Sequence, residues 1–385
     1  MTADQLAKGP LEEILKRVSS MHTTDPKAES ALFAAALGGF ELPKTTILEA
    51  ANEMANYRPQ DVANKNLRQK KGWANRYKRA ANAFVEVISD KPIIDITSND
   101  IRNYEKCWQK RVDNERVTSD YAKKHLGYLR SIIVEFYKSV DVEEYVNPFS
   151  MLKGIERTNR EKHAEGSEKL EFTPKWIKET LIDQTKIQGL NQQARDILII
   201  CAETGCRQTE IYDVPASAIF LDASVPYFNI RFEADKDDAR EIKNRSSIRP
   251  IPLIGAALEA MKRNPDGFPA YRGNANFSNT ANKFFKENDL LPSPNHKISG
   301  IRHSFETRLI RARVESDDRG YMMGHSVKKM RGREKYGNAT DLKLRALFCE
   351  LIAFPTTDWH PRASEEVWDE IYQFLEAEGH RPRRR

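Results

Sequence analysis

Two segments place a basic residue where it could bind or protonate a phosphate group. In TGCRQTEI, Arg207 follows an apolar stretch and Glu210 comes three residues later, so the two side chains would share a helix face and could pair. In EIKNRSSIRPIPL, Lys243 occupies a polar turn between two strand-like runs, with Lys236 and Arg245 as competing basic residues. Arg207 is therefore a candidate phosphate ligand or a structural partner of Glu210, and Lys243 is a candidate proton donor.

Two later segments add an arginine, two histidines and a tyrosine. GIRHSFETRL holds Arg302 and His303, and MMGHSVKKMRGREKYG holds His325 with Tyr336 eleven residues further on. Tyr336 follows a basic run and precedes a glycine, which fits an exposed nucleophile, whereas Tyr321 is expected in the core. Arg302 has a salt-bridge alternative and His325 a capping or core alternative, and His303 is expected to be structural rather than catalytic.

Together these residue types suit phosphoryl transfer without a metal. Two arginines can bind the non-bridging oxygens of one phosphodiester, because their charge is permanent and their donors are forked. A lysine can protonate the leaving oxygen, and a tyrosine can attack phosphorus if nearby cations help its phenol to ionise. Acid pairs that would hold Mg²⁺ are not apparent in this set, unlike in nuclease sites that use two metals.

Residues 66–350 resemble the tyrosine recombinase family, the phage integrase group. The resemblance rests on TGCRQTEI, KNRSSIRPIPL, the IRHSF run, and GHS followed by a tyrosine, in that order and at similar separations. It implies a mainly α fold with a small antiparallel β-sheet (α+β). A helical core-binding domain at 66–155 would precede a mixed catalytic domain at 172–350.

The resemblance also implies roles for five residues. Arg207 and Arg302 would clamp the scissile phosphate, Lys243 would protonate the departing 5′-hydroxyl, and His325 would hydrogen-bond the phosphate. Tyr336 would form a covalent 3′-phosphotyrosine link, which a 5′-hydroxyl from a partner duplex then attacks. The implied protein is a site-specific DNA recombinase or integrase of a mobile genetic element, acting as a homotetramer on double-stranded DNA without cofactor, metal or ATP.

Two features depart from the family pattern. The family often has a histidine three residues before its second arginine, and here that position is Ser299, which cannot act as an equivalent base. His303 or His296 could compensate. The gap between His325 and Tyr336 is slightly longer than usual and strongly basic, so we expect a mobile loop that delivers the tyrosine on assembly.

Periodicity and turn residues suggest how the chain is divided. Residues 1–65 hold short helix-like segments of unknown role, and 66–155 form amphipathic helices with apolar residues on one face. The polar stretch 156–171 is expected to be a linker. In 172–350, a buried helix ends at TGC, and the runs SAIFLD, PYFNIRFE and SSIRPIPL predict three strands. The tail, 351–385, is predicted to contact either a neighbouring subunit or its own catalytic domain.

A basic segment with interleaved aromatic residues opens the helical region. NKNLRQKKGWANRYKR contains no acidic residue, which fits contact with a phosphate backbone, although a solvated helix face would look similar. The candidate DNA-binding residues are Lys65, Arg68, Lys70, Lys71, Arg76, Lys78 and Arg79.

Composition sets limits on the class of protein. The formal net charge of +6 over 385 residues permits a nucleic-acid partner without requiring one. No apolar run is long enough to span a bilayer and no signal peptide is apparent, so we expect a cytoplasmic protein. The four cysteines fit no zinc spacing and are expected to be reduced thiols: Cys107, Cys201, Cys206 and Cys349.

Two alternative functions stay open at this point. A type IB topoisomerase-like enzyme would use the same chemistry but religate the same strand. A DNA-binding accessory protein with weakened catalysis would retain the phosphate site without the base, and Ser299 is the feature that favours it.

Overall fold

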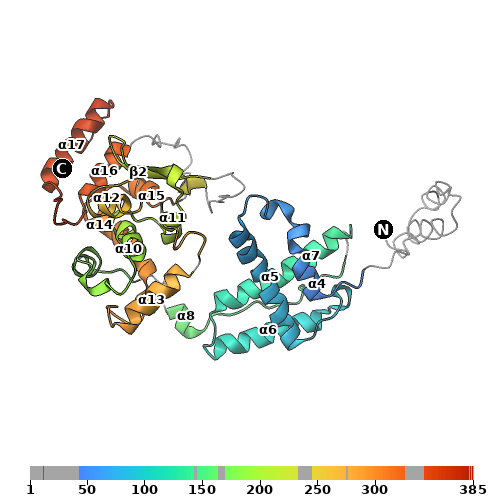
Figure 1. Ribbon diagram of the computed structural model, residues 1–385. Coiled ribbons are helices and arrows are strands. Elements are labelled where there is room, and N and C mark those ends of the chain that lie inside the picture. The colour runs from blue at the N-terminus through green and yellow to red at the C-terminus, as the bar shows by residue number, and fades with distance from the viewer. Residues whose placement is uncertain are drawn as a thin grey trace. The chain divides into compact units, whose positions relative to one another are not determined.

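The computed structural model describes residues 43–142, 145–163, 170–232, 245–274, 276–325 and 342–380, together with residues 12, 382 and 384. The described chain is mainly helical, with one three-stranded antiparallel sheet, which confirms the predicted fold class (Figure 1). Contacts divide the chain into two compact units, Met1–Glu165 and Gly166–Arg385.

Unit 1 is built from helices whose starts are fixed by side-chain caps. Thr46, Asn66 and Thr97 each accept a backbone N–H three residues on, and a side chain there returns a bond to the cap residue. These capping boxes satisfy N–H groups that a helix start leaves unpaired. The described helices of the unit are α4 (Ile47–Tyr57), α5 (Leu67–Val87), α6 (Ser98–Asp113), α7 (Ser119–Ser139) and α8 (Asn159–His163), with 3₁₀ turns at Pro59–Asp61 and Ile93–Asp95.

The core of unit 1 lies where α4, α5, α6 and α7 meet. Trp73, Tyr77 and Phe84 of α5 are buried there as their spacing predicts, together with residues of α6 and α7. Helix α4 lies inside the segment expected to be a separate N-terminal region, yet its Ile47 is fully buried in this same core. Tyr121, near the start of α7, is 43% exposed.

The stretch expected to be a linker contains α8, whose side chains contact earlier residues of unit 1. The Glu161 carboxylate accepts the backbone N–H of Ser119 at 2.8 Å, at the first residue of α7. Arg160 pairs with Glu115 at 2.6 Å on the surface. The first part of this stretch is therefore attached to the helices before it.

Unit 2 places helices around the small sheet. The strands are β1 (Ile219–Phe220), β2 (Tyr227–Ile230) and β3 (Arg249–Pro252), in the order β1-β2-β3, and each falls inside one of the three predicted runs. The helices are α9 (Pro174–Ile177), α10 (Gln192–Thr204), α11 (Gln208–Tyr212), α12 (Gly255–Lys262), α13 (Phe277–Glu287), α14 (Ile301–Arg311), α15 (Ser316–Met322), α16 (Leu342–Glu350) and α17 (Ser364–Ala377). Short helical turns occupy Lys178–Ile182 (π) and Thr185–Ile187, Ala216–Ala218, Arg245–Ser247 and Ile298–Gly300 (3₁₀).

Helix α10 is the centre of the unit 2 core, and its end sets up the site. It packs against α12 and α14, and nearly all of its residues from Ile197 onward are buried. The helix stops at Gly205, whose φ of 65° favours glycine. A Cβ at this position would lie 2.3 Å from the Phe305 ring of α14, so only glycine lets the two helices approach so closely.

The tail packs onto its own unit. Val367 and Ile371 of α17 are buried in one cluster with Phe348 of α16 and with Phe305 and Leu309 of α14. Arg362 joins the two segments through Glu350 and Glu370, both at 2.7 Å. The contact with the same chain, one of the two predicted alternatives, is therefore present.

Candidate active site

The turn between α10 and α11 positions the first arginine. Arg207 is the N-cap of α11, and its backbone N–H donates to the Glu210 carboxylate at 2.8 Å. Its guanidinium also donates to Glu210, at 2.6 Å, and to the Ser247 hydroxyl at 3.3 Å. The predicted pairing of Arg207 with Glu210 is present, but the pair closes a cap instead of lying along a helix face.

Glu210 is a buried carboxylate shared by three arginines. Besides Arg207, the Arg249 guanidinium lies 3.3 Å and the Arg302 guanidinium 3.8 Å from its Oε2. Burial opposes ionisation of this carboxyl, but Arg249, the Arg207 backbone N–H, Arg302 and the Arg207 side chain outweigh it and hold its pKa below the usual value. Three guanidiniums around one carboxylate leave a surplus of positive charge.

Arg302 projects from the first turn of α14 and is held by backbone carbonyls. Its Nη1 donates to the Gly205 carbonyl at 2.6 Å, and its Nη2 donates to the Met323 carbonyl. Burial lowers the pKa of Arg302, and the neighbouring Arg207 and Arg249 act in the same direction. An arginine nevertheless stays charged in proteins, so a rigidly held cation faces the site.

Arg249 is a site residue that the sequence analysis did not single out. Its side chain is only 1% exposed, and it donates to the carbonyls of Met322 and Ser247, each at 2.9 Å, as well as to Glu210. It thereby joins β3, α11 and the end of α15. A signal for it exists in the sequence, because Arg249 alternates with Ile251 on the inward face of a strand.

The turn that carries His325 is shaped around Arg249. Gly324 has a φ of 61°, and a Cβ there would lie 2.4 Å from the Arg249 guanidinium. The His325 backbone N–H donates to the Gly320 carbonyl at 2.9 Å, and the residue is exposed. Partial burial and then the charge of Arg302 lower the pKa of the His325 imidazole, so it is mainly neutral at neutral pH.

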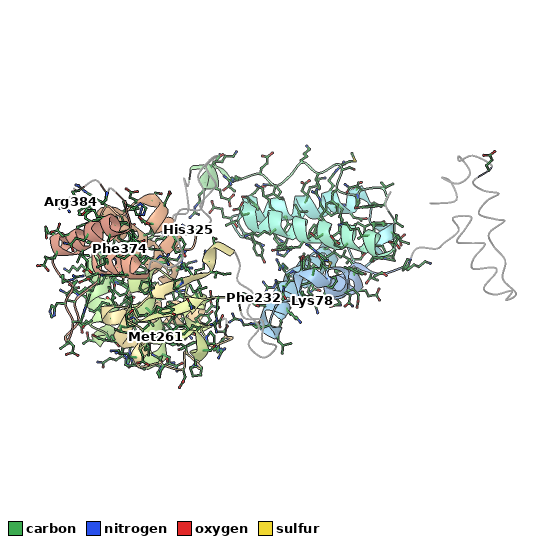
Figure 2. The ribbon with its side chains drawn as sticks, turned by 90° about the horizontal axis from the view of Figure 1, so that it is seen from above. Lys78, Phe232, Met261, His325, Phe374 and Arg384 are labelled. Atoms are coloured by element: carbon green, nitrogen blue, oxygen red, sulfur yellow. The ribbon has the colours of Figure 1, made fainter. Side chains whose placement is uncertain are left out.

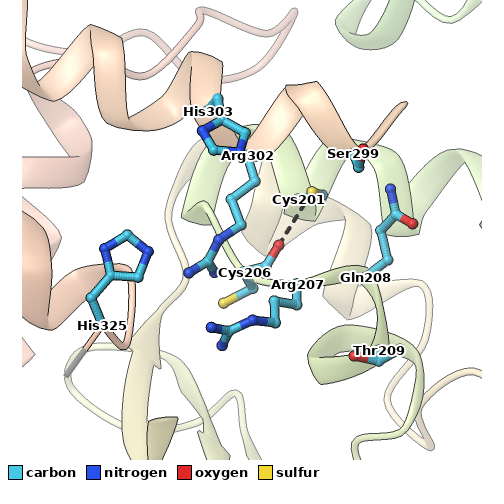
Figure 3. Close-up of a pocket in the computed structure, with 9 residues that line it drawn as sticks. All are labelled: Cys201, Cys206, Arg207, Gln208, Thr209, Ser299, Arg302, His303 and His325. Carbon is cyan, nitrogen blue, oxygen red and sulfur yellow. Dashed lines mark hydrogen bonds between the residues drawn. The ribbon is translucent and has the colours of Figure 1, made fainter. Parts of the chain in front are cut away.

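Of these residues, Arg207, Arg302 and His325 line one pocket of about 400 Å³. Figure 3 shows the guanidiniums of Arg207 and Arg302 at this hollow, with His325 on one side and Ser299 and Gln208 on the other. The residues that line it are Cys201, Cys206, Arg207, Gln208, Thr209, Ser299, Arg302, His303 and His325. A cavity with a surplus of fixed cations can bind an anion such as a phosphodiester.

The remaining candidates stand differently. Ser299 and His303 line the pocket, and both are half-buried. Lys243 and Tyr336 lie outside the described residues, as does the loop expected to deliver the tyrosine. Tyr321 lies in α15 with the Arg345 guanidinium 3.8 Å from its ring centre, and it does not line the pocket.

The basic segment of unit 1 lies on α5 and just before it. Among the predicted DNA ligands, Lys70, Lys71, Lys78 and Arg79 are exposed, whereas Lys65, Arg68 and Arg76 are half-buried. Figure 2 labels Lys78 on this helix. Arg76 lies over three rings, those of Trp73, Tyr77 and Tyr128, at 5.5–5.8 Å. These cation–π contacts hold its guanidinium against the α5–α7 surface.

Within the described ranges, no group of three or more His, Cys, Asp or Glu side chains could hold a metal ion. No helix in that part of the chain is long and apolar enough to cross a membrane. The four cysteines are free thiols, and Cys201, Cys206 and Cys349 are buried.

No family model and no curated protein sequence matches the chain. Among solved structures, it is similar to the Tn1549 transposon integrase in complex with circular intermediate DNA, at 17% identity and a TM-score of 0.47, covering 84% of this chain and 99% of that one. A lambda integrase dimer bound to a COC′ core site is similar at 14% identity and a TM-score of 0.49, covering 85% of this chain and 88% of that one. The XerH site-specific recombinase bound to a palindromic difH substrate is similar at 14% identity and a TM-score of 0.48, covering 74% of this chain and 92% of that one. Likeness at this level carries no weight for function, which depends on the side chains themselves.

Proposed function

We propose that the chain is a site-specific DNA recombinase that breaks and rejoins strands through a phosphotyrosine intermediate. The observation that carries the proposal is the convergence of Arg207, Arg302 and His325 on one pocket beside the buried Glu210. Both guanidiniums are held by contacts made before any ligand binds, which is the condition for stabilising charge that develops in a transition state.

The proposed reaction exchanges one phosphodiester for another. The Tyr336 phenol loses its proton to solvent with the help of nearby cations, and its oxygen attacks phosphorus. A tyrosyl–phosphate bond forms and the bond to the 5′-oxygen breaks, while Lys243 gives that oxygen a proton. Arg207 and Arg302 bind the non-bridging oxygens, and His325 donates a hydrogen bond to one of them. A 5′-hydroxyl from a second duplex then attacks the phosphotyrosine and releases the tyrosine. The number of phosphodiester bonds therefore does not change, and no nucleoside triphosphate is consumed.

The proposed partner is double-stranded DNA held by a homotetramer. The exposed lysines of α5 would contact backbone phosphates, because they face solvent on a helix that carries no acidic side chain from Leu67 to Ala83. Each subunit would then contribute one clamp on the scissile phosphate and one basic helix for the flanking duplex.

Covalent capture of a nicked duplex tests the proposal. The duplex would be chosen by selecting bound sequences from a random pool, and the nick would let the short 5′-hydroxyl product diffuse away. Tyr336→Phe should abolish the denaturant-resistant adduct while leaving DNA affinity unchanged, and the matched Tyr321→Phe should retain the adduct.

Three other results would contradict the proposal. An adduct that persists in Tyr336→Phe would place the nucleophile elsewhere. Tight, sequence-selective binding with no adduct in the wild-type protein would favour the DNA-binding accessory protein. Relaxation of supercoiled plasmid without exchange between duplexes would favour the topoisomerase-like alternative.

A further inference from the structure

Gln208 is a buried residue of the pocket for which the mechanism above has no use. It follows Arg207 directly, begins α11 and lines the same hollow as Arg302 and Ser299. Its exposed fraction is 8%, so the polar end of its side chain is largely withdrawn from solvent. Buried polar atoms of side chains normally have at least one hydrogen-bond partner each.

Only one end of the Gln208 amide has such a bond. The Ser278 hydroxyl of α13 donates to its Oε1 at 2.5 Å, which fixes the plane of the amide. The Nε2 group is buried, and no atom of the described residues accepts a hydrogen bond from it. Figure 3 shows this nitrogen directed toward the side of the hollow where Ser299 lies.

An unpaired donor of a residue that lines the same pocket as two arginines has a clear chemical meaning. Native proteins rarely leave a buried N–H without an acceptor, and the exceptions gather at functional sites. The cations next to it attract an anion, whose oxygens are the acceptors that the amide lacks. A neutral donor that gains its partner only with the ligand is the arrangement that stabilises an oxyanion.

We propose that Gln208 is a further catalytic residue, whose Nε2 donates a hydrogen bond to a non-bridging oxygen of the bound phosphodiester. This inference rests on the proposed function and adds a third donor to the two guanidiniums, on the Ser299 side of the pocket. The small Ser299 side chain lines that side, at a position where a histidine is common in the family that the sequence resembles. Ser278 is then the positioning residue that keeps Nε2 turned toward the substrate.

Single-turnover cleavage of the selected nicked duplex tests the role of Gln208. Gln208→Met keeps the length of the side chain and removes the donor, so the rate should fall about 10²-fold, as is usual on loss of one oxyanion donor. The melting temperature should change little, because removal of the unpaired buried donor offsets loss of the hydrogen bond from Ser278. Gln208→Glu, which keeps the acceptor for Ser278 and replaces the donor by a negative charge, should be slower still.

A methylphosphonate at the scissile position distinguishes a direct hydrogen bond from Gln208 to the phosphate from a purely structural role of Gln208. One of its diastereomers lacks the oxygen that Gln208 binds, and on that substrate wild type and Gln208→Met should cleave at equal rates. On the other diastereomer the difference should persist. The salt dependence of DNA binding should be the same in both proteins, because the amide carries no charge.

The possible failures are distinguishable. If the wild type forms an adduct and Gln208→Met cleaves at the wild-type rate, or is slowed equally on both diastereomers, the inference is overturned while the proposed function stands. If the wild type forms no adduct, the proposed function fails. The donor is then tested by the rise in melting temperature with inorganic phosphate. A smaller rise in Gln208→Met supports it, and an equal rise overturns it.

Discussion

Two buried glutamates of unit 2, Glu203 and Glu210, meet arginines in opposite ways. Glu203 belongs to the end of α10, where it accepts from Arg308 at 3.1 Å and from the backbone N–H of Phe354 at 3.1 Å. Arg308 also donates to the carbonyls of Ile352 and Ala202 and lies over the Phe354 ring. One carboxylate and one guanidinium are balanced there, within the core.

Glu210 is balanced differently, because three arginines surround it and two of them line a pocket. Burial raises the pKa of Glu203, since a single arginine does not offset the loss of solvent. The pKa of Glu210 is lowered, because its several cations outweigh the same burial. The ratio of arginine to carboxylate and the access to a pocket therefore separate a structural ion pair from a candidate anion site.

The largest expected effect is on the structural pair. Arg308→Met would leave the Glu203 carboxylate buried without its counter-charge and should lower the free energy of unfolding by about 3–5 kcal/mol at neutral pH. Urea denaturation measures this loss. The matched double variant with Glu203→Gln should recover most of it, and an equal loss in both variants would show that the ion pair is not its source.

The second effect concerns the connecting arginine. Arg249→Met should lower the free energy of unfolding by about 1–3 kcal/mol, since it leaves the carbonyls of Met322 and Ser247 unpaired while Glu210 keeps two other arginines. DNA cleavage should fall as well, because the turn before His325 loses its support. A variant that loses stability but cleaves at the wild-type rate would remove Arg249 from the site.

The third effect appears in binding and hardly at all in stability. Arg207 is 34% exposed on its side chain, so Arg207→Met should change the free energy of unfolding by less than about 1 kcal/mol. The slope of log affinity for DNA against log salt should shrink by roughly one, for one lost phosphate contact. Arg362→Met, on the tail, is the matched control and should leave the slope unchanged.

The smallest effect is a difference in pH dependence. The lowered pKa of Glu210 means that its contribution to stability is present above the ordinary glutamate value of 4.5 and disappears as pH falls through the folded value. The raised pKa of Glu203 reverses this, so its contribution is present below 4.5 and is lost as pH rises through the folded value. The free energy of unfolding should be measured across this pH range in wild type and in each variant. In Glu210→Gln, the decrease in stability toward acid pH should become smaller. In Glu203→Gln, the decrease in stability toward higher pH should become smaller. Identical profiles would contradict the comparison.

Local sequence predicted the elements of unit 2 well. The three strands fall in the runs rich in Ile, Phe and Tyr, and the helix before TGC ends at Gly205, because turn residues and periodicity act over a few positions. The pairing of Arg207 with Glu210 could be predicted for the same reason, because the two residues are three positions apart. The sequence did not predict that Ile47, within 1–65, belongs to the core of the helices that follow, because its burial depends on tertiary packing.

Contacts between distant segments account for what sequence analysis missed. Arg249 joins Glu210 and Met322, which are far from it in the sequence. Its alternation with Ile251 predicts an inward-facing side chain but does not show which distant residues it contacts. The amide of Gln208 is oriented by a hydrogen bond from Ser278, a residue on another helix. Lys243 and Tyr336 stay predictions of the motif order alone.

Identification of the residue that becomes linked to DNA tests the central claim most directly. The wild-type protein would be reacted with the selected nicked duplex, digested, and its nucleotide-bearing peptide sequenced by mass spectrometry. The account predicts a phosphodiester on Tyr336, and no such peptide in Arg302→Met protein that still binds the duplex. A modified residue other than Tyr336, or an adduct that forms equally well without Arg302, would contradict it.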